Sequence, residues 1–411
     1  MSGAADVSGL TQRTIFRSSS AAWRGSSAER DASLAVIPRK GLIALHKGDP
    51  CFATPAHICA AQQQAVEQGY THYPELRGDA ELRQIIAEQA SARAGRQYTA
   101  EEVLITAGAT QAIFLAMTAY LDAGDEVLLF DPTFSLYAPV IRQTGATPVA
   151  VAMTAGFRID PDRLRSSVTD RTKMIVINNP ANPTGVVLTR EEVESVAAVA
   201  ATKQLLILTD EVYDHLLYDA QHVRMIDMPQ IAEQVLYVNS FSKTYAMTGW
   251  RLGYVLAPAR LLAPIVTIHA NSMSQVHWPT QRAGIAALTA SQESVESMRI
   301  GYAARRRSLV DALARIPHSY VSEPQGAFYA FFRFDPALEI TSAQATQILL
   351  GAGVAVRSGS EFGRAGEGWL RLTFAASISD IERGAEIARA TFGRLGASPL
   401  PLALHRRRAV R

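Results

Sequence analysis

The stretch that decides the fold is SFSKTYAMTGWRLGY at residues 240–254, which follows the apolar run QVLYVN at residues 234–239. The run QVLYVN is short, β-branched and free of charge, which is typical of a strand buried on both faces. Directly after it come Ser240 and Lys243, and eight residues beyond the lysine stands Arg251. A hydroxyl, an amine and a guanidinium therefore follow the carboxyl end of a buried strand, where open α/β sheets bind their ligands.

Similar apolar runs recur along the chain and alternate with helical patterns. The other expected buried strands are EEVLIT (101–106), DEVLLF (125–130), KMIVIN (173–178), LLILTD (205–210) and LGYVL (252–256). Helical patterns follow several of them, at residues 110–122, 134–144 and 190–203. Strands that alternate with helices predict an α/β fold with a mostly parallel sheet and helices on both of its faces.

The last quarter of the chain predicts a second, smaller unit. A long helical pattern begins near residue 295. Expected strands follow at YAFFRF (329–334), VAV (354–356) and LRLTF (370–374). We therefore expect a large domain at residues 60–292 and a smaller α+β domain built from residues 34–59 and 293–396.

The two ends of the chain have a different composition. Residues 1–33 are rich in Ser, Ala and Arg without hydrophobic periodicity, which predicts a disordered leader. Residues 397–411 end in LHRRRAVR and are expected to be a frayed basic tail.

Composition argues against several classes of protein. The 411 residues carry 40 basic and 38 acidic side chains, so no strong field directs the chain to nucleic acid or to a membrane surface. No apolar run approaches the length that spans a bilayer. The cysteines Cys51 and Cys59 and the nine histidines show no metal-ligand spacing, so no metal is expected. Both thiols are expected to be small buried groups in a reducing, cytoplasmic setting.

Lysine is scarce, which makes Lys243 informative. Only five of the 40 basic residues are lysine, so the chain strongly prefers arginine. Lysine differs from arginine in having an amine that can lose its proton and attack a carbonyl group, most easily when a pocket removes it from water. This favours a lysine that forms an imine, with Ser240 and Arg251 available to hold an anionic group nearby.

Two loops beyond strands carry further candidates, each with a simpler structural explanation. TAGATQAIF (106–114) places small residues, Ala109 and Thr110 among them, at a helix N-terminus, where free backbone N–H groups could hold a phosphate. A glycine used only for tight packing would explain that stretch equally well. NNPANPTGVVL (178–188) could aim the amide of Asn182 into the site, or it could form a plain turn.

Two buried charges complete the set. Asp210 ends a very apolar strand, with Tyr213 three residues later, and a carboxylate there is costly unless it meets a cation. The alternative is a helix N-cap. Arg371 stands between apolar neighbours in LRLTFA and could grip a carboxylate in bidentate fashion or form a structural ion pair. A lysine imine, a phosphate cradle, an arginine and a strand-end carboxylate together describe a pyridoxal phosphate site.

These motifs, in this order, resemble the class I/II aminotransferases, which are fold-type-I pyridoxal-phosphate enzymes. The matching pieces are GDPCFATP (48–55), YPELRGDAELR (73–83), TAGATQA, NPANPTG, DEVY, SFSKTYAMTGWRLGY, VAVRSGSEFG (354–363) and LRLTFA. The resemblance covers roughly residues 45–395. It implies a large domain with a mostly parallel, seven-stranded sheet flanked by helices, together with a smaller α+β domain.

The resemblance also implies roles for single residues. Lys243 would carry the cofactor as a Schiff base and move the substrate proton, while Asp210 would keep the pyridinium nitrogen protonated. Tyr213 and Asn182 would bond the ring oxygen. The phosphate would be held by Ser240, Arg251 and the backbone of Ala109 and Thr110. Phe134 would stack on the ring. Arg371 would bind the substrate carboxylate, together with Asn182 and the backbone near Gly48. Tyr73 would reach the phosphate of a neighbouring subunit, which implies a homodimer.

The expected activity is therefore an aminotransferase that moves an amino group between an L-amino acid and a 2-oxo acid by a ping-pong mechanism. A lysine that some aspartate-using relatives carry at the position of Thr110 is absent, which disfavours that route to dicarboxylate specificity. Two alternatives remain. The same cofactor site could serve a β-lyase or another enzyme of Cα chemistry, and the fold could be a ligand-sensing domain of a transcription regulator. The short leader leaves no room for a winged helix, which disfavours the regulator.

Overall fold

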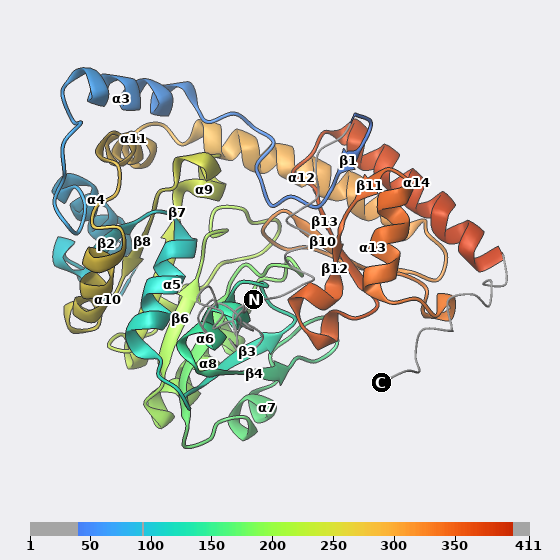
Figure 1. Ribbon diagram of the computed structural model, residues 1–411, viewed down its shortest axis with the longest axis horizontal. Helices are drawn as coiled ribbons and strands as arrows, with labels where there is room; N and C mark the ends of the chain where they lie inside the picture. Colours follow the sequence, from blue (N-terminus) through green and yellow to red (C-terminus); the bar gives the residue numbers. More distant parts are fainter. Residues whose placement is uncertain (1–39, 93, 398–411) are drawn as a thin grey trace, which may run out of the picture.

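A seven-stranded sheet forms the centre of the larger part of the molecule (Figure 1). The computed structural model describes residues 40–92 and 94–397. Along the sheet the strands run in the order β2, β8, β7, β6, β5, β3, β4. Their bounds are β2 Val103–Thr106, β3 Glu126–Asp131, β4 Thr147–Ala152, β5 Thr172–Asn178, β6 Leu206–Asp210, β7 Val235–Ser240 and β8 Gly253–Leu256. Strand β8 is antiparallel to both neighbours and every other pair is parallel, so the predicted mostly parallel α/β sheet is confirmed.

Helices cover both faces of this sheet, because alternate strand residues bury their side chains on opposite sides. Leu208, Leu236 and Val255 belong to the apolar cluster under α5, α6 and α10. Ile207 and Val235 belong to the cluster on the other face, which α4 and α8 share. The helices are α3 Ala56–Glu67, α4 Ala80–Ser91, α5 Ala109–Tyr120, α6 Tyr137–Thr144, α7 Pro161–Ser166, α8 Arg190–Lys203, α9 Phe241–Thr244, α10 Ala259–Ser272 and α11 Trp278–Thr289.

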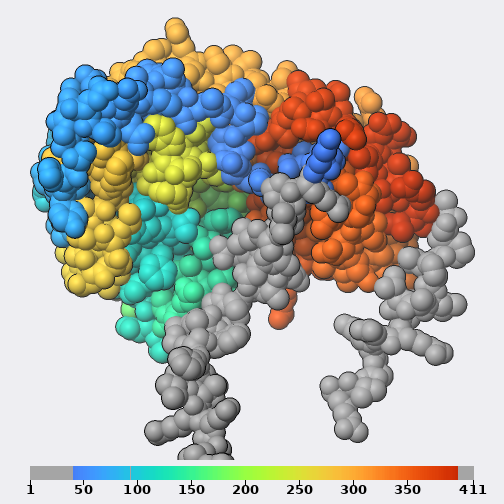
Figure 2. Space-filling view, turned by 45° about the horizontal axis from the view of Figure 1, so that its top comes forward, coloured from blue at the N-terminus to red at the C-terminus, as the bar shows by residue number. Residues whose placement is uncertain are grey.

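A second, antiparallel sheet lies in the C-terminal part, in the order β12, β13, β10, β9. Its strands are β9 Tyr320–Ser322, β10 Tyr329–Arg333, β12 Arg357–Ser358 and β13 Trp369–Thr373. The helices of this part are α12 Glu293–Ala314, α13 Ser342–Gly351 and α14 Ile378–Ala397. Near its start the described chain also joins this part, because β1 (Ile43–Ala44) pairs with β11 (Val354–Ala355). Figure 2 shows this darkest blue segment among the red C-terminal residues.

The main departures from the sequence predictions are one strand and two cysteines. Strand β4 was not predicted, because only Val151 of its six residues is fully buried and the run lacks the continuous apolar signal. Cys51 and Cys59 are both exposed, so the expectation of buried thiols is wrong. Cys59 follows the buried Ile58 on α3, and one step along a helix turns a side chain by about 100°, away from the packed face. Cys51 lies in the loop before that helix.

Some predictions fall outside the described residues or concern absences. The leader at residues 1–33 and the tail beyond residue 397 lie outside the described ranges. Within residues 40–92 and 94–397, no helix combines the length and the apolarity needed to cross a membrane. The same residues contain no group of three or more His, Cys, Asp or Glu side chains arranged to hold a metal ion.

Candidate active site

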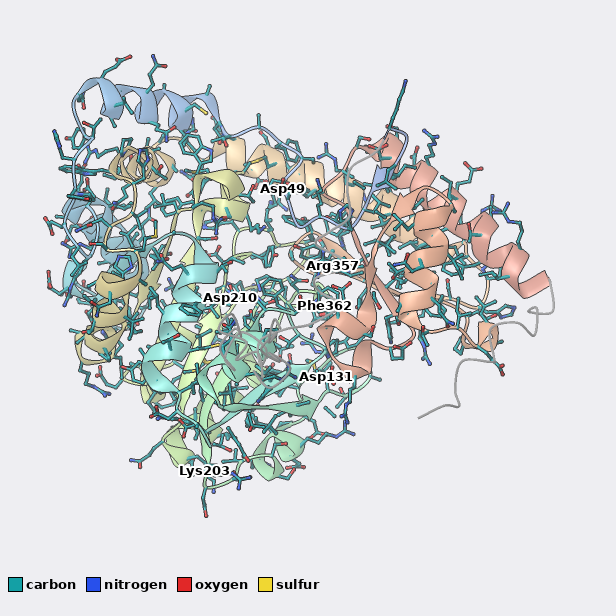
Figure 3. All side chains as sticks on the ribbon, in the orientation of Figure 1. Asp49, Asp131, Lys203, Asp210, Arg357 and Phe362 are labelled. Atoms are coloured by element: carbon teal, nitrogen blue, oxygen red, sulfur yellow. The ribbon has the colours of Figure 1, made fainter. Side chains whose placement is uncertain are left out.

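A cavity of about 640 Å³ opens where three neighbouring parallel strands of the large sheet end. Strands β5, β6 and β7 end in Asn178, Asp210 and Ser240, and all three side chains line the cavity. The C-terminal sheet closes it from the other side with Tyr329, Arg357 and Arg371. In Figure 3 the labelled Asp210 and Arg357 lie in the central region between the two sheets. Polar side chains from both parts of the molecule therefore meet in one hollow, as expected for a ligand site at strand ends.

Most predicted site residues line this one cavity. They are Gly48, Ala109, Thr110, Phe134, Asn182, Asp210, Tyr213, Ser240, Lys243, Arg251 and Arg371. The exception is Tyr73, which is 86% exposed and does not line the cavity. A single chain thus assembles the predicted constellation apart from the residue expected to act on a neighbouring subunit.

Lys243 presents a weakly basic amine to the cavity. It lies on the one-turn helix α9, directly after β7, and its Nζ donates a hydrogen bond to the carbonyl of Gly48. Removal from water lowers the pKa of Lys243 from 10.5 to about 8, with the positive charges of Arg371 and Arg251 acting in the same direction. A substantial fraction of this amine is unprotonated near pH 8, as nucleophilic attack on a carbonyl requires.

Asp210 is a carboxylate held at the bottom of the cavity. It is 3% exposed, and burial raises its pKa from 3.8 to about 6. Its Oδ2 accepts a hydrogen bond of 2.7 Å from the hydroxyl of Tyr137, which opposes that rise. Tyr137 was missed at the sequence level because a tyrosine at the start of a helix carries no distinct signal. The buried negative charge makes this end of the cavity suited to a cationic group.

A cradle for an anion lies where α5 begins. Gly108 precedes the helix with a φ of +82°, and a Cβ at this position would come within 2.6 Å of the Arg251 Nη2. The guanidinium donates to the backbone carbonyls of Thr248 and Ala107, which fixes it beside the turn. The first N–H groups of a helix have no intrahelical partner, so a helix N-terminus, an arginine and the hydroxyl of Ser240 converge on one place.

Arg371 is a buried cation without a carboxylate partner in the described part of the chain. The residue is 1% exposed. The guanidinium donates a hydrogen bond of 3.0 Å to Asn182 Oδ1 and one of 2.6 Å to the carbonyl oxygen of His46. Its Nε has no hydrogen-bond partner among the described residues. Burial lowers its pKa to about 10. An uncompensated buried guanidinium is costly, and an anionic ligand would stabilise it through bidentate hydrogen bonds.

A second arginine, which the sequence reasoning missed, lies beside Arg371. Arg357 is the cross-strand partner of Arg371 between β12 and β13, and it is also buried and lines the cavity. Glu361 accepts hydrogen bonds from Arg357 and, within the described part of the chain, forms no ion pair with Arg371, so one carboxylate faces two neighbouring guanidiniums and pairs with only one of them. The combined positive charge also affects the nearby His46. Burial lowers the pKa of His46 from 6.5 to about 4, and the positive charges of Lys47, Arg371 and Arg357 act in the same direction.

Aromatic and amide groups complete the walls. The hydroxyls of Tyr213 and Tyr329 lie 2.9 Å apart, and burial keeps the pKa of both above the usual value. Phe134 is half-buried beside Tyr137, with ring centroids 5.6 Å apart. The chain also approaches closely at Gly48, where a Cβ would collide with the Tyr329 hydroxyl. Tyr329 was predicted only as part of a strand, so its place in the site is new.

The fold and the site together define an α/β enzyme with a buried reactive amine between an anion cradle and an unpaired arginine. The family description "Aminotransferase class I and II" matches residues 40–387. The chain belongs to this family, and it is a pyridoxal-phosphate-dependent aminotransferase of fold type I. The predicted family, fold, activity class and cofactor are thereby confirmed.

Individual relatives agree with this assignment. The chain is 38% identical to an aspartate aminotransferase of Pyrococcus horikoshii, covering 82% of this chain and 87% of the relative. It is 36% identical to an aspartate/prephenate aminotransferase of Thermus thermophilus, covering 89% and 95%. Among solved structures, the aspartate aminotransferase from Thermus thermophilus with maleate superposes with a TM-score of 0.85 at 33% identity, over 91% of this chain and all of that one. An aromatic aminotransferase from Pyrococcus horikoshii gives 0.84 at 35%, covering 90% of this chain and 100% of that one.

Proposed function

We propose that the cavity holds pyridoxal phosphate through Lys243, Asp210 and the Gly108 turn, and that it exchanges amino groups between an L-amino acid and a 2-oxo acid by a ping-pong mechanism. The observation that carries this proposal is that the amine of Lys243 and the unpaired guanidinium of Arg371 line the same cavity as the buried carboxylate of Asp210. The cradle beside Arg251 suits a phosphate, because a side chain at Gly108 would fill it. The residues present therefore fit the cofactor.

Each residue then has a distinct task. Bound here, pyridoxal phosphate supplies an aldehyde and an electron-withdrawing ring, which make the α-proton of an amino acid acidic. Lys243 would take that proton from the Cα of the amino donor and, in the second half-reaction, deliver a proton to the Cα of the amino acid that forms, since its pKa near 8 suits both directions at neutral pH. The carboxylate of Asp210 would keep the ring nitrogen of the cofactor protonated and positively charged. Arg371 fixes the substrate α-carboxylate, and Asn182 orients Arg371 through its 3.0 Å hydrogen bond.

We further propose that the preferred amino donor has an acidic side chain. Like charges directly opposite each other on neighbouring strands are unfavourable, and Arg357 and Arg371 are such a pair, of which only Arg357 has a carboxylate partner, Glu361. Lys47 adds a further positive charge to the cavity wall. The names of several relatives, aspartate aminotransferases, support the same substrate class. Because Glu361 neutralises only one of the two guanidiniums, the pair keeps a net positive charge, and with Arg357 lining the cavity it offers a route to a second carboxylate that does not need a lysine at Thr110.

Absorption spectroscopy and product analysis test the reaction class. The protein loaded with pyridoxal phosphate is mixed with aspartate, and the visible band of the covalently bound cofactor is expected to bleach and then return when 2-oxoglutarate is added. Glutamate should form in amounts equal to the aspartate consumed. A β-lyase would instead release ammonia and pyruvate from a single amino acid that carries a leaving group on Cβ, with no second oxo acid added, and that result would overturn the aminotransfer proposal.

The substrate class is tested with Arg357→Met, with the exposed Arg364→Met as the matched control. Hydrogen bonds to charged groups are worth about 1.5–3 kcal/mol, so kcat/KM for aspartate should fall about 10- to 100-fold. For alanine, which lacks the second carboxylate, kcat/KM should change little. An equal fall for both substrates would show that Arg357 only positions Glu361 or Arg371.

We also propose that the active form is a homodimer that works in the cytoplasm. Tyr73 supports the first part, because this large aromatic residue is 86% exposed in the single chain although its motif implies a cofactor contact. Light scattering of the purified protein should give twice the chain mass. A dimer with a normal cofactor affinity in Tyr73→Ala would contradict the role given to this residue.

A further inference from the structure

A second cavity, separate from the catalytic residues, lies between helix α4 and strands β7 and β8. Its volume is about 320 Å³, which is within the range of small-molecule sites. Ile86 and Ala90 of α4 form one wall, and Tyr237 and Tyr254 of the strands form another. The exposed His215 lies among the lining residues, so the cavity reaches the surface.

Asp214 supplies an uncompensated charge to this cavity. Its side chain is 9% exposed, and its Oδ1 has no hydrogen-bond partner among the described residues. Oδ2 accepts a single bond of 3.0 Å from the amide of Asn239 and lies 4.0 Å from Nε2 of the half-exposed His215. A buried carboxylate oxygen without a partner is costly, so the site favours a cationic hydrogen-bond donor.

Among the described residues that line the cavity, the other side chain that is always charged, that of Arg224, is already neutralised. Arg224 donates to both carboxylate oxygens of Asp227, at 3.0 Å and 2.6 Å, and a further bond goes to the Ala90 carbonyl. This pairing leaves Arg224 with little net charge to offer Asp214. The described lining residues therefore present the negative charge of Asp214 to the cavity.

The walls around Asp214 are aromatic. Tyr237, Tyr245 and Tyr254 line the cavity, and the rings of Tyr237 and Tyr254 lie 6.3 Å apart between centroids. Burial, followed by the charge of Asp214, raises the pKa of all three phenols, so their hydroxyls stay protonated and neutral. Aromatic rings that line a cavity together with a carboxylate are surroundings that can bind organic ammonium ions.

We propose that this cavity binds a small organic ammonium ion, with Asp214 as its counter-ion and the three tyrosine rings as its walls. The volume exceeds what a bare metal ion needs, and Asp214 is the one carboxylate among the described lining residues, whereas Ca²⁺ sites typically use several carboxylates. The site is also connected to the active site. Asp214 directly follows Tyr213, and Ser240 lines both cavities, so an occupant would contact the segments that carry two predicted cofactor-binding residues.

Trimethylammonium is the probe for this site. Its single N–H can donate to Asp214, but a tertiary amine cannot condense with the cofactor, so binding in the second cavity is separated from reaction at Lys243. Calorimetric titration of the cofactor-loaded enzyme at constant ionic strength should show one site per chain with a dissociation constant of the order of 1 mM. Potassium chloride and tert-butanol, which lack the organic group and the charge respectively, should not bind.

Two variants and one control complete the test. Asp214→Asn keeps the shape and removes the charge, so it should weaken trimethylammonium binding at least about tenfold. Ala90→Leu fills the cavity from α4 and should abolish binding even if the first variant folds poorly. The exposed Asp170→Asn, which removes the same charge from a residue that does not line the cavity, should bind like the parent. Absence of binding at 50 mM, equal binding of potassium, or unchanged affinity in Asp214→Asn would overturn the proposal.

Discussion

Replacing Lys243 by methionine should stabilise the cofactor-free protein while destroying its ability to bond the cofactor. The pKa of Lys243 is about 8 in the folded chain and 10.5 ordinarily, so burying the charged amine costs about 3 kcal/mol, at about 1.4 kcal/mol per pH unit. Methionine has a similar length and no charge. The variant also loses the hydrogen bond from Lys243 to the Gly48 carbonyl, and this loss cancels about 1 kcal/mol of the gain in stability. A net gain of about 2 kcal/mol remains, or an unfolding midpoint about 2–3 °C higher.

The sign of the pH dependence follows from the lowered pKa. Below pH 8 the amine is protonated in both states, and the folded state bears the full cost. Between pH 8 and 10.5 only the unfolded state keeps the proton, so the stability of the parent rises with pH. The advantage of the methionine variant should therefore be largest at pH 7 and should shrink as the pH approaches 10.5.

The assay is thermal unfolding of the two cofactor-free proteins between pH 6.5 and 10. The matched control is Lys203→Met, which changes an exposed lysine at the end of α8, far from the labelled Asp210 in Figure 3. The control should show no pH-dependent gain. If Lys243→Met is less stable than the parent at pH 7, or if its advantage does not change with pH, the inference that Lys243 is a desolvated amine is wrong.

Three further changes test the remaining parts of the site. Tyr137→Phe removes the hydrogen bond that favours the Asp210 carboxylate, so the pKa of Asp210 should rise from about 6 by about 1–2 units, and the pH below which cofactor affinity falls should rise equally. Gly108→Ala should weaken cofactor binding at least about tenfold. Gly124 has a φ of +100° and open space around it, so Gly124→Ala should lose stability through backbone strain and keep its cofactor affinity. Arg371→Lys should raise KM for every amino acid about 100-fold, because lysine cannot form the bidentate pair, and an unchanged KM would contradict its role.

Local sequence was sufficient for much of the architecture. The strands from EEVLIT to LGYVL were predicted because each contains a short apolar segment, free of charge, that a mostly parallel sheet buries on both faces. Lys243 and Asp210 stood out for a related reason, since a polar group at the end of such a run needs a partner or a function. Strand β4, half of which faces solvent, lacked this signal and was missed.

Tertiary structure decided what lies beside what. Arg357 and Arg371 become neighbours only when β12 pairs with β13, and Tyr137 reaches Asp210 from 73 residues away. The second cavity likewise depends on α4, β7 and β8 meeting around Asp214. Sequence periodicity reports whether a residue is buried, because burial depends on the local pattern of apolar side chains. Charge pairing and pKa depend on which distant groups share that buried space. Only the packing of the folded chain determines which groups those are.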